Sequence, residues 1–226
     1  MDSLGVGVIG YGFIGKVHCH AHLSIPLFYS PPPARARLVG VASATEATGK
    51  AAMEQAGFRF ATTDYRQIID SEEVQIVHIC TPNDLHTEQA LAAIHAGKHV
   101  YCDKPLAAGL GDAQRSYQAS LGAAGVCQMT FNYRFVPALL RARELAQQGF
   151  LGDLYAFRVA YLHAGYVDPS RPYSWRVDRA RSGGGAVADL GSHAIDLLRF
   201  LVGPGTAVGR AGEVASITGR LQTVIP

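Results

Sequence analysis

The stretch Val6-Gly7-Val8-Ile9-Gly10-Tyr11-Gly12-Phe13-Ile14-Gly15 decides the fold. Its apolar residues up to Ile9 predict a buried strand, and the G-x-G-x-x-G spacing predicts a tight turn that opens a helix. Gly10 allows the turn, and Gly12 lets the backbone approach a phosphate without an intervening Cβ. Gly15 lets the helix pack against the strand, while the helix N-terminus offers N–H groups to an anion. The stretch therefore predicts a dinucleotide site rather than a glycine-rich surface loop.

Composition indicates an ordinary globular protein. The chain has 226 residues, of which 48% are hydrophobic and 17% charged, so it can bury a core of normal size. The net charge is +2, and positive and negative residues are dispersed along the chain. This argues against nucleic-acid and membrane partners. We expect no membrane span and no signal peptide. The four cysteines lack C-x-x-C spacing, so we expect small buried residues in a reducing compartment and a cytoplasmic protein.

Strand and helix patterns alternate over residues 1–131. After a long loop expected over Ser24 to Pro33, strands are expected over 38–42, 74–80, 99–102 and 126–131. Helices are expected over 46–56, 65–69, 85–96 and 112–123. Such alternation implies right-handed crossovers and a doubly wound parallel sheet. We therefore expect residues 1–131 to form an α/β Rossmann domain that binds NAD(P).

Residues 132–226 have another character. A helix is expected over 136–148, a strand over 154–162, an irregular stretch over 169–185, and an amphipathic helix over 189–201. One or two final strands are expected over 214–225. This small number of strands and helices makes a poor independent core. We therefore expect an incomplete α/β domain.

Two groups of polar residues follow predicted strands. Thr81, Pro82, Asn83 and His86 lie after one strand, and Asp103-Lys104-Pro105 lies after the next. Open α/β sheets bind ligands at the carboxyl ends of their strands, which favours a site here. The plainer alternatives are a turn in which Asn83 or Asp84 caps a helix, and a solvated Lys104.

A third group lies on the helix expected over 189–201. There Asp189 and His193 are spaced i, i+4 and share a face, with Asp196 one turn further. The alternative is a solvated helix flank, in which Asp189 complements the helix dipole. Three glycines at 183–185 precede the helix and favour a site.

The histidines at 18, 20 and 22 raise the question of a metal. Only His18 and His22 share a helix face, and no nearby acid or cysteine completes a ligand set. We therefore expect no metal site and interpret the three histidines as structural or solvated.

Cofactor choice depends on the end of the second strand. An acid there normally binds the ribose 2′-hydroxyl and repels a 2′-phosphate. This chain has Ser43 at that position, with Glu46 as an alternative, so either NAD or NADP is expected to bind.

Taken in order, these motifs resemble the Gfo/Idh/MocA oxidoreductase family, the relatives of glucose-fructose oxidoreductase and inositol dehydrogenase. The resemblance implies a Rossmann domain followed by an α/β domain with a large, open, mostly antiparallel sheet. It implies that Lys104, Asp189 and His193 are catalytic. The residues that it implies for cofactor binding are Gly10, Gly12, Phe13, Ile14, Gly15, Ser43, Thr81, Pro82, Asn83, His86, Asp103, Lys104, Trp175 and Arg176.

The chain departs from the family pattern in two ways. It has Asp103 where the family usually has Glu, and the family's second domain continues beyond residue 226. The resemblance implies NAD(P)-dependent hydride transfer to or from a secondary alcohol of a sugar, cyclitol or polyol. It also implies a homo-oligomer that assembles through the C-terminal sheet of a longer form. The alternatives are a dinucleotide-binding regulator, an inactive fragment, and a glycoside-cleaving enzyme assisted by NAD.

Overall fold

A computed structural model describes residues 3–165, 168, 170, 172–203 and 214–222. The chain divides into two compact units. The first comprises residues 1–130 and 178–185, and the second comprises residues 131–177 and 186–226.

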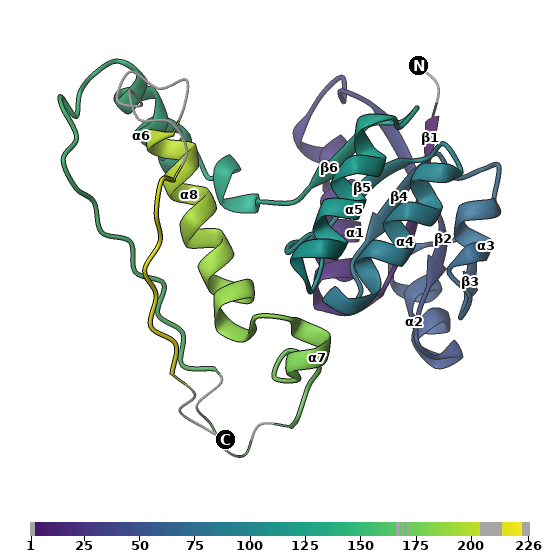
Figure 1. Ribbon diagram of the computed structural model, residues 1–226. Coiled ribbons are helices and arrows are strands. Elements are labelled where there is room, and N and C mark those ends of the chain that lie inside the picture. Colours follow the sequence, from purple (N-terminus) through teal and green to yellow (C-terminus); the bar gives the residue numbers. More distant parts are fainter. Residues whose placement is uncertain (1–2, 166–167, 169, 171, 204–213, 223–226) are drawn as a thin grey trace. The chain divides into compact units, whose positions relative to one another are not determined.

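The first unit is built on one six-stranded parallel sheet with the strand order β3-β2-β1-β4-β5-β6. Its strands are β1 (Ser3–Ile9), β2 (Arg35–Ala42), β3 (Phe60–Thr62), β4 (Ile76–Ile79), β5 (His99–Cys102) and β6 (Cys127–Met129). Its helices are α1 (Phe13–Phe28), α2 (Glu46–Ala56), α3 (Arg66–Asp70), α4 (Asn83–His95), α5 (Leu110–Leu121) and α7 (Arg179–Ser182). Figure 1 shows the helices around this sheet. The expected Rossmann arrangement is confirmed.

Two apolar clusters lie on opposite faces of the sheet. Val6 and Val8 of β1 point to one face, where they meet Cys19 of α1 and Ala52 of α2. Ile9 points to the other face, together with residues of α3 and α4. Alternate residues of a strand point to opposite faces, so a central strand with both faces covered is apolar throughout.

Helix α1 is longer than the sequence predicts. It continues to Phe28 and includes Pro26, where the sequence pattern favours a loop from residue 24. Proline has a backbone angle compatible with a helix and costs a single hydrogen bond near the C-terminal end, so the helix can continue past it. The Tyr29 N–H then closes the last turn on the Ile25 carbonyl.

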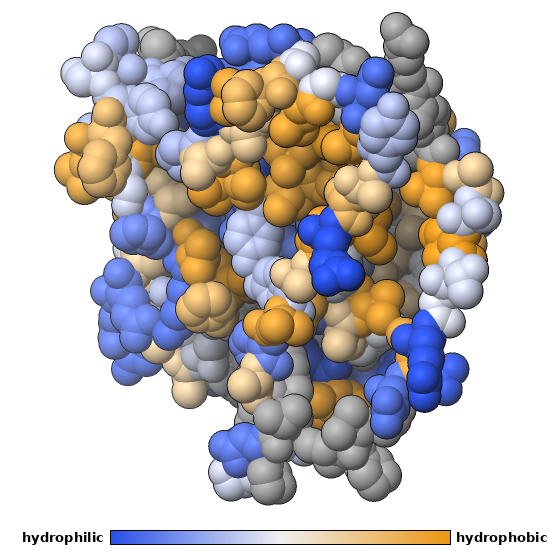
Figure 2. Space-filling model, turned by 90° about the vertical axis from the view of Figure 1, so that its left-hand side faces the viewer, coloured by the Kyte–Doolittle hydropathy of each residue, from blue (hydrophilic) through white to orange (hydrophobic). Residues whose placement is uncertain are grey.

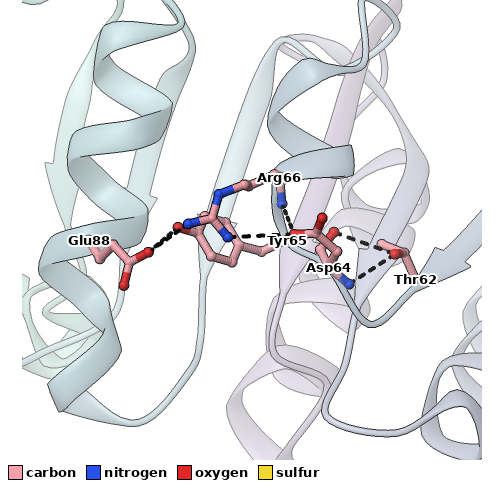
Figure 3. Close-up of polar contacts among 5 residues, drawn as sticks. All are labelled: Thr62, Asp64, Tyr65, Arg66 and Glu88. Carbon is pink, nitrogen blue, oxygen red and sulfur yellow. Dashed lines mark hydrogen bonds and ion pairs between the residues drawn. The ribbon is translucent and has the colours of Figure 1, made fainter.

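A polar cluster joins α3 to α4 (Figure 3). Glu88 of α4 accepts hydrogen bonds from the Tyr65 hydroxyl at 2.6 Å and from Arg66 Nη2 at 3.0 Å. Burial and the bond to Glu88 raise the pKa of Tyr65 to about 12, so the phenol keeps its proton and remains a donor. The cluster begins just after β3, where Asp64 accepts from the Arg66 N–H.

The regular secondary structure of the second unit, among its described residues, is helical. It contains a 3₁₀ turn η1 (Asn132–Phe135), α6 (Pro137–Gln147), a π-helical turn η2 (Val187–Gly191) and α8 (Ser192–Val202). The expected helix over 189–201 is therefore correct for its larger part but opens with a π turn. That turn ends at Gly191, a weak helix former.

The expected antiparallel sheet is not confirmed, because every strand among the described residues is parallel and belongs to the first unit. Residues 154–162 have a strand-like sequence but form no strand, and the same holds for 214–222. A segment becomes a strand only when a neighbour pairs with its backbone groups, and no described segment does so here. The end of the last predicted strand, 223–225, lies outside the described residues.

The second unit exposes many apolar side chains, and Figure 2 shows apolar surface on the face toward the viewer. Examples from 154–162 are Tyr155 at 94% exposure and Leu162 at 91%. Among the described residues, no helix has both the length and the apolar composition of a membrane span.

Candidate functional site

The register of the sheet brings the ends of its strands into one row. Ala42, Ile9, Ile79 and Cys102 are the last residues of β2, β1, β4 and β5, and each pairs with the next across the sheet. The residues that follow them therefore open their loops at one edge of the sheet. The backbone hydrogen bonds between neighbouring strands continue into these loops. Gly10 N–H donates to Ala42 O at 2.8 Å, and Asp103 N–H donates to Ile79 O at 2.9 Å.

The three glycines after β1 have different surroundings. Gly10 has a φ of +96°, and an added Cβ would lie 2.6 Å from the Cys80 carbonyl oxygen. A Cβ on Gly15 would lie 2.0 Å from the Gly10 carbonyl oxygen. Gly12, at the N-cap of α1, has a φ of −81° and no heavy atom within 4 Å of its Cβ position. The fold itself thus requires Gly10 and Gly15, whereas Gly12 leaves an open approach to the N-terminus of α1.

The loop after β4 is fixed from several sides. Thr81 Oγ1 donates to Gln89 Oε1 at 2.7 Å. The buried Asn83 donates from Nδ2 to the Ser182 carbonyl oxygen of α7 at 2.9 Å. Helix α4 has Pro82 as its N-cap without a side-chain cap, so the expected capping by Asn83 or Asp84 is wrong. Asp84 instead forms an ion pair with Arg181 of α7 at 3.3 Å.

The loop after β5 contains the Asp103-Lys104-Pro105 motif. The Asp103 carboxylate accepts a hydrogen bond from Thr130 Oγ1 at 2.9 Å, so the loop after β6 holds it in place. Lys104 is half-buried directly after Asp103. His86 of α4 contacts both loops, with Nε2 2.9 Å from Thr81 O and Nδ1 2.9 Å from Pro105 O.

Ser43 begins the loop after β2. It is buried, and its hydroxyl donates to the Thr45 carbonyl oxygen at 2.8 Å. Thr45 caps α2, whose first residue is Glu46. No carboxylate stands between the end of β2 and Glu46.

In the second unit, His193 is surrounded by aromatic rings. Its ring centroid lies 4.8 Å from that of Tyr133 and 6.0 Å from that of Phe131, and it stacks on Tyr161 at 6.2 Å. The Tyr133 and Tyr161 hydroxyls are 2.8 Å apart, and this hydrogen bond raises the pKa of Tyr133 to about 12. Asp189 lies in the π turn one turn before His193.

Two further residues of this unit were predicted on resemblance. The Arg176 guanidinium lies 4.6 Å from the Trp175 ring centroid, as a stacked cation–aromatic pair. Lys104 belongs to the first unit, whereas Asp189, His193, Trp175 and Arg176 belong to the second. Their convergence on one site remains a prediction.

Asp196 has a structural partner. Its buried carboxylate accepts from Arg134 Nε at 3.1 Å and 2.9 Å, and also from Arg134 Nη2. The interpretation of Asp196 as part of a solvated helix flank is therefore wrong. Arg134 lies before α6, far from Asp196 in the sequence. No local sequence pattern predicts an ion pair between such distant residues.

His18 and His22 share a face of α1, as predicted, and both contact His78 of β4. His18 Nδ1 lies 2.7 Å from His78 Nδ1, and His22 Nε2 lies 3.0 Å from His78 Nε2. Burial lowers the pKa of all three, that of His78 to about 2. The described residues contain no group of three or more His, Cys, Asp or Glu that could hold a metal ion.

All four cysteines are free, as expected. Cys19 and Cys102 are buried, and burial raises the pKa of Cys19 to about 11 and that of Cys102 further. These thiols behave as small core residues rather than as nucleophiles.

Sequence reasoning missed several residues of the site. Thr130 could have been found, because it follows the sixth strand at the edge where the other candidates lie. Tyr133 and Tyr161, which surround His193, carry no spacing signal. Gln89, which supports Thr81, resembles any other polar helix residue in the sequence.

The comparisons with known proteins agree with this geometry. A family model described as an oxidoreductase family with an NAD-binding Rossmann fold matches residues 4–131. A model of the GFO/IDH/MocA C-terminal domain matches residues 139–226. The fold and motifs therefore define a Rossmann protein of the oxidoreductase class. Within that class, the chain belongs to the Gfo/Idh/MocA family.

Two curated relatives illustrate the similarity. Levoglucosan dehydrogenase of Pseudarthrobacter phenanthrenivorans is 40% identical over 226 residues, which is 100% of this chain and 56% of that protein. The 1,5-anhydro-D-fructose reductase of Ensifer adhaerens is 35% identical over 165 residues, which is 73% of this chain and 49% of that protein. The chain thus spans about half the length of the curated relatives it matches.

Solved structures give the same result. Levoglucosan dehydrogenase in complex with NADH superposes with a TM-score of 0.86 at 40% identity, covering 89% of this chain and 54% of that chain. The complex of the same enzyme with NADH and levoglucosan has the same TM-score, identity and coverage.

Proposed function

We propose that this protein is an NAD(P)-dependent dehydrogenase that oxidises a secondary alcohol of a sugar, cyclitol or related polyol, or catalyses the reverse reduction. The observation that carries the proposal is the single sheet edge at which the Gly10–Gly15 turn, the Thr81-Pro82-Asn83 loop and Lys104 all begin. The similarity to levoglucosan dehydrogenase supports an anhydrosugar as the first substrate to test.

The first unit is the proposed cofactor domain. The open space at Gly12 and the free N–H groups at the start of α1 fit a dinucleotide pyrophosphate. When bound, the nicotinamide ring supplies the hydride acceptor or donor. Since no acid follows β2 before Glu46, we propose that NADP binds within about tenfold of NAD in affinity, a difference of at most about 1.4 kcal/mol.

The proposed catalytic residues move the proton. His193 takes the hydroxyl proton, because an imidazole can accept and release protons near neutral pH. Asp189, one turn earlier, orients His193. Lys104 stabilises the negative charge that develops on the substrate oxygen, or relays the proton. The proposal includes an antiparallel sheet and a homo-oligomer for a longer form that contains this chain.

The proposal is tested by binding first and by turnover second. We expect the purified chain to bind NADH in a calorimetric titration, and the whole protein to reduce NAD in the presence of levoglucosan or an inositol. Lys104→Ala and His193→Ala should each lower kcat at least about a hundredfold, because each removes a proton-transfer or charge-stabilising group. Both variants should lower turnover far more than they weaken NADH binding. Binding without turnover on any polyol would instead favour a dinucleotide-binding regulator.

A further inference from the structure

We propose that Asn83 is a positioning residue that holds residues 178–185, called here the α7 segment, against the two loops of the proposed dinucleotide site. This inference deepens the proposed function and rests on it. The α7 segment contains helix α7 and belongs to the first unit, although residues 131–177, which precede it in the chain, belong to the second unit. A segment that is remote in sequence therefore packs on the proposed cofactor domain.

Asn83 supplies the contact between the α7 segment and the loop after β4. Its Nδ2 donates to the Ser182 carbonyl oxygen at 2.9 Å, across a sequence separation of 99 residues. Both residues are buried, with Asn83 5% and Ser182 4% exposed. Loss of the donor would leave a buried carbonyl without this bond, which is costly. A side chain with so little exposed surface has little left to offer a cofactor, so Asn83 acts through the α7 segment.

Gly183 supplies the contact between the α7 segment and the loop after β5. Its φ is +80°, and an added Cβ would lie 1.9 Å from the Ala108 carbonyl oxygen. Only glycine allows the two backbones to approach so closely. Ala108 follows the Asp103-Lys104-Pro105 motif and precedes α5. The α7 segment therefore contacts the loop that carries Lys104 as well as the loop that carries Asn83.

Two further contacts support this arrangement. Arg181 Nε lies 3.3 Å from Asp84 Oδ2, and both side chains are partly exposed. Solvent screens such an ion pair, so it contributes less than the buried bond of Asn83. Asp178 caps α7 by accepting a hydrogen bond from the Ala180 N–H at 2.9 Å, and this cap stabilises the short helix that carries the contacts.

The contacts of the α7 segment have a consequence for binding. Loops that are already held in place need not be ordered when a ligand binds, so the packed α7 segment favours the dinucleotide. Ordering the backbone of a single residue costs the equivalent of about a tenfold change in affinity. Because linkage is reciprocal, the dinucleotide must stabilise the packed segment by the same factor by which the segment strengthens binding.

Hydrogen exchange of the 226-residue chain, with and without NADH, tests this linkage. We expect saturating NADH to slow the exchange of amides in the α7 segment about tenfold. Asn83→Ala removes the donor without adding charge near the site. It should abolish this protection and lower the calorimetric NADH affinity about tenfold. In each variant the amides of β1 and β4 should still exchange far more slowly than those of the α7 segment, which shows that the sheet remains folded.

Gly183→Ala tests the same linkage from the other loop. The new Cβ meets the Ala108 carbonyl oxygen and displaces the α7 segment from the loop after β5. We expect the same loss of protection and of NADH affinity, about tenfold, as in Asn83→Ala. Gly185→Ala is the matched control, because Gly185 also has a positive φ, +51°, but no heavy atom within 4 Å of its Cβ position. It should keep the wild-type affinity within about twofold.

The outcomes separate the positioning role from the proposed function. If the chain binds NADH but the α7 segment shows no change in exchange, the positioning role is overturned and the dehydrogenase proposal stands. Loss of affinity in Asn83→Ala but not in Gly183→Ala would also overturn it, because Asn83 would then contact the cofactor directly. If the wild type binds no NADH, the proposed function fails. Exchange of residues 103–109 in Asn83→Ala then decides: faster exchange there supports the link between the loops, and unchanged exchange overturns it.

Discussion

The two units of this chain differ in whether their strand-like segments form strands. In the first unit, short apolar segments such as Ile76–Ile79 pair on both sides within the sheet. In the second unit, residues 154–162 are also largely apolar, yet they form no strand and expose most of their side chains. The first segment has strand partners on both sides, whereas the second has none among the described residues.

This comparison shows where the stability of each unit comes from. The first unit buries apolar clusters on both faces of a sheet that satisfies its own backbone. The described part of the second unit depends on packing between helices and on polar contacts such as Arg134 with Asp196. An unpaired strand-like segment also invites pairing with another chain.

Hydrogen exchange should separate the two units most strongly. We expect amides of β1 and β4 to exchange at least about a thousandfold more slowly than those of residues 154–162, because only the former need global unfolding to open. Mass spectrometry of the exchanged, digested chain measures both regions in one sample. Equal protection of 154–162 would mean that this segment has a strand partner and that the comparison is wrong.

Loss of the Arg134–Asp196 pair should have the next largest effect. Arg134→Ala leaves the buried Asp196 carboxylate without its partner and should lower the free energy of unfolding by about 2–3 kcal/mol. Fluorescence of Trp175, the one tryptophan of the chain, reports on this unit during thermal unfolding.

The control for Arg134 is Arg141→Ala. Arg141 forms an exposed i, i+3 pair with Glu144 at 2.9 Å, so its loss should cost about 0.5 kcal/mol or less. If both variants were equally mild, the second unit would not depend on the buried pair.

Acid should destabilise the first unit through its three clustered histidines. Folding lowers the pKa of His18, His22 and His78 below the ordinary value of 6.5, so below that pH the unfolded chain binds more protons than the folded one. For His78 alone we expect a loss of about 1.4 kcal/mol per pH unit below about 6.5.

Denaturant unfolding at about pH 7 and about pH 5.5 measures this slope. His78→Gln should make it shallower. His20→Gln, on the exposed side of the same helix, should leave it unchanged. A slope that does not respond to His78→Gln would rule out the histidine cluster as its source.

The alternation of strands and helices predicts the first unit, because each of its segments finds a neighbour within the same unit. The edge where Thr81 and Lys104 lie is also predictable, because parallel strands end together. Residues 154–162 could not be predicted, since pairing depends on segments elsewhere. The bonds of Asn83 to Ser182 and of Arg134 to Asp196 join positions far apart in the chain, and no local pattern encodes them.

The binding of NADH to Gly12→Val tests the central claim most directly. A Cβ at Gly12 meets no protein atom within 4 Å, so the variant should fold with an unchanged Tm. Gly109→Val is the matched control, since Gly109 is the N-cap of α5 and is equally open. We predict that calorimetry shows NADH affinity reduced at least about a hundredfold in Gly12→Val and unchanged in Gly109→Val. Unchanged affinity in a folded Gly12→Val would contradict the assignment of the Gly10–Gly15 turn as the dinucleotide site.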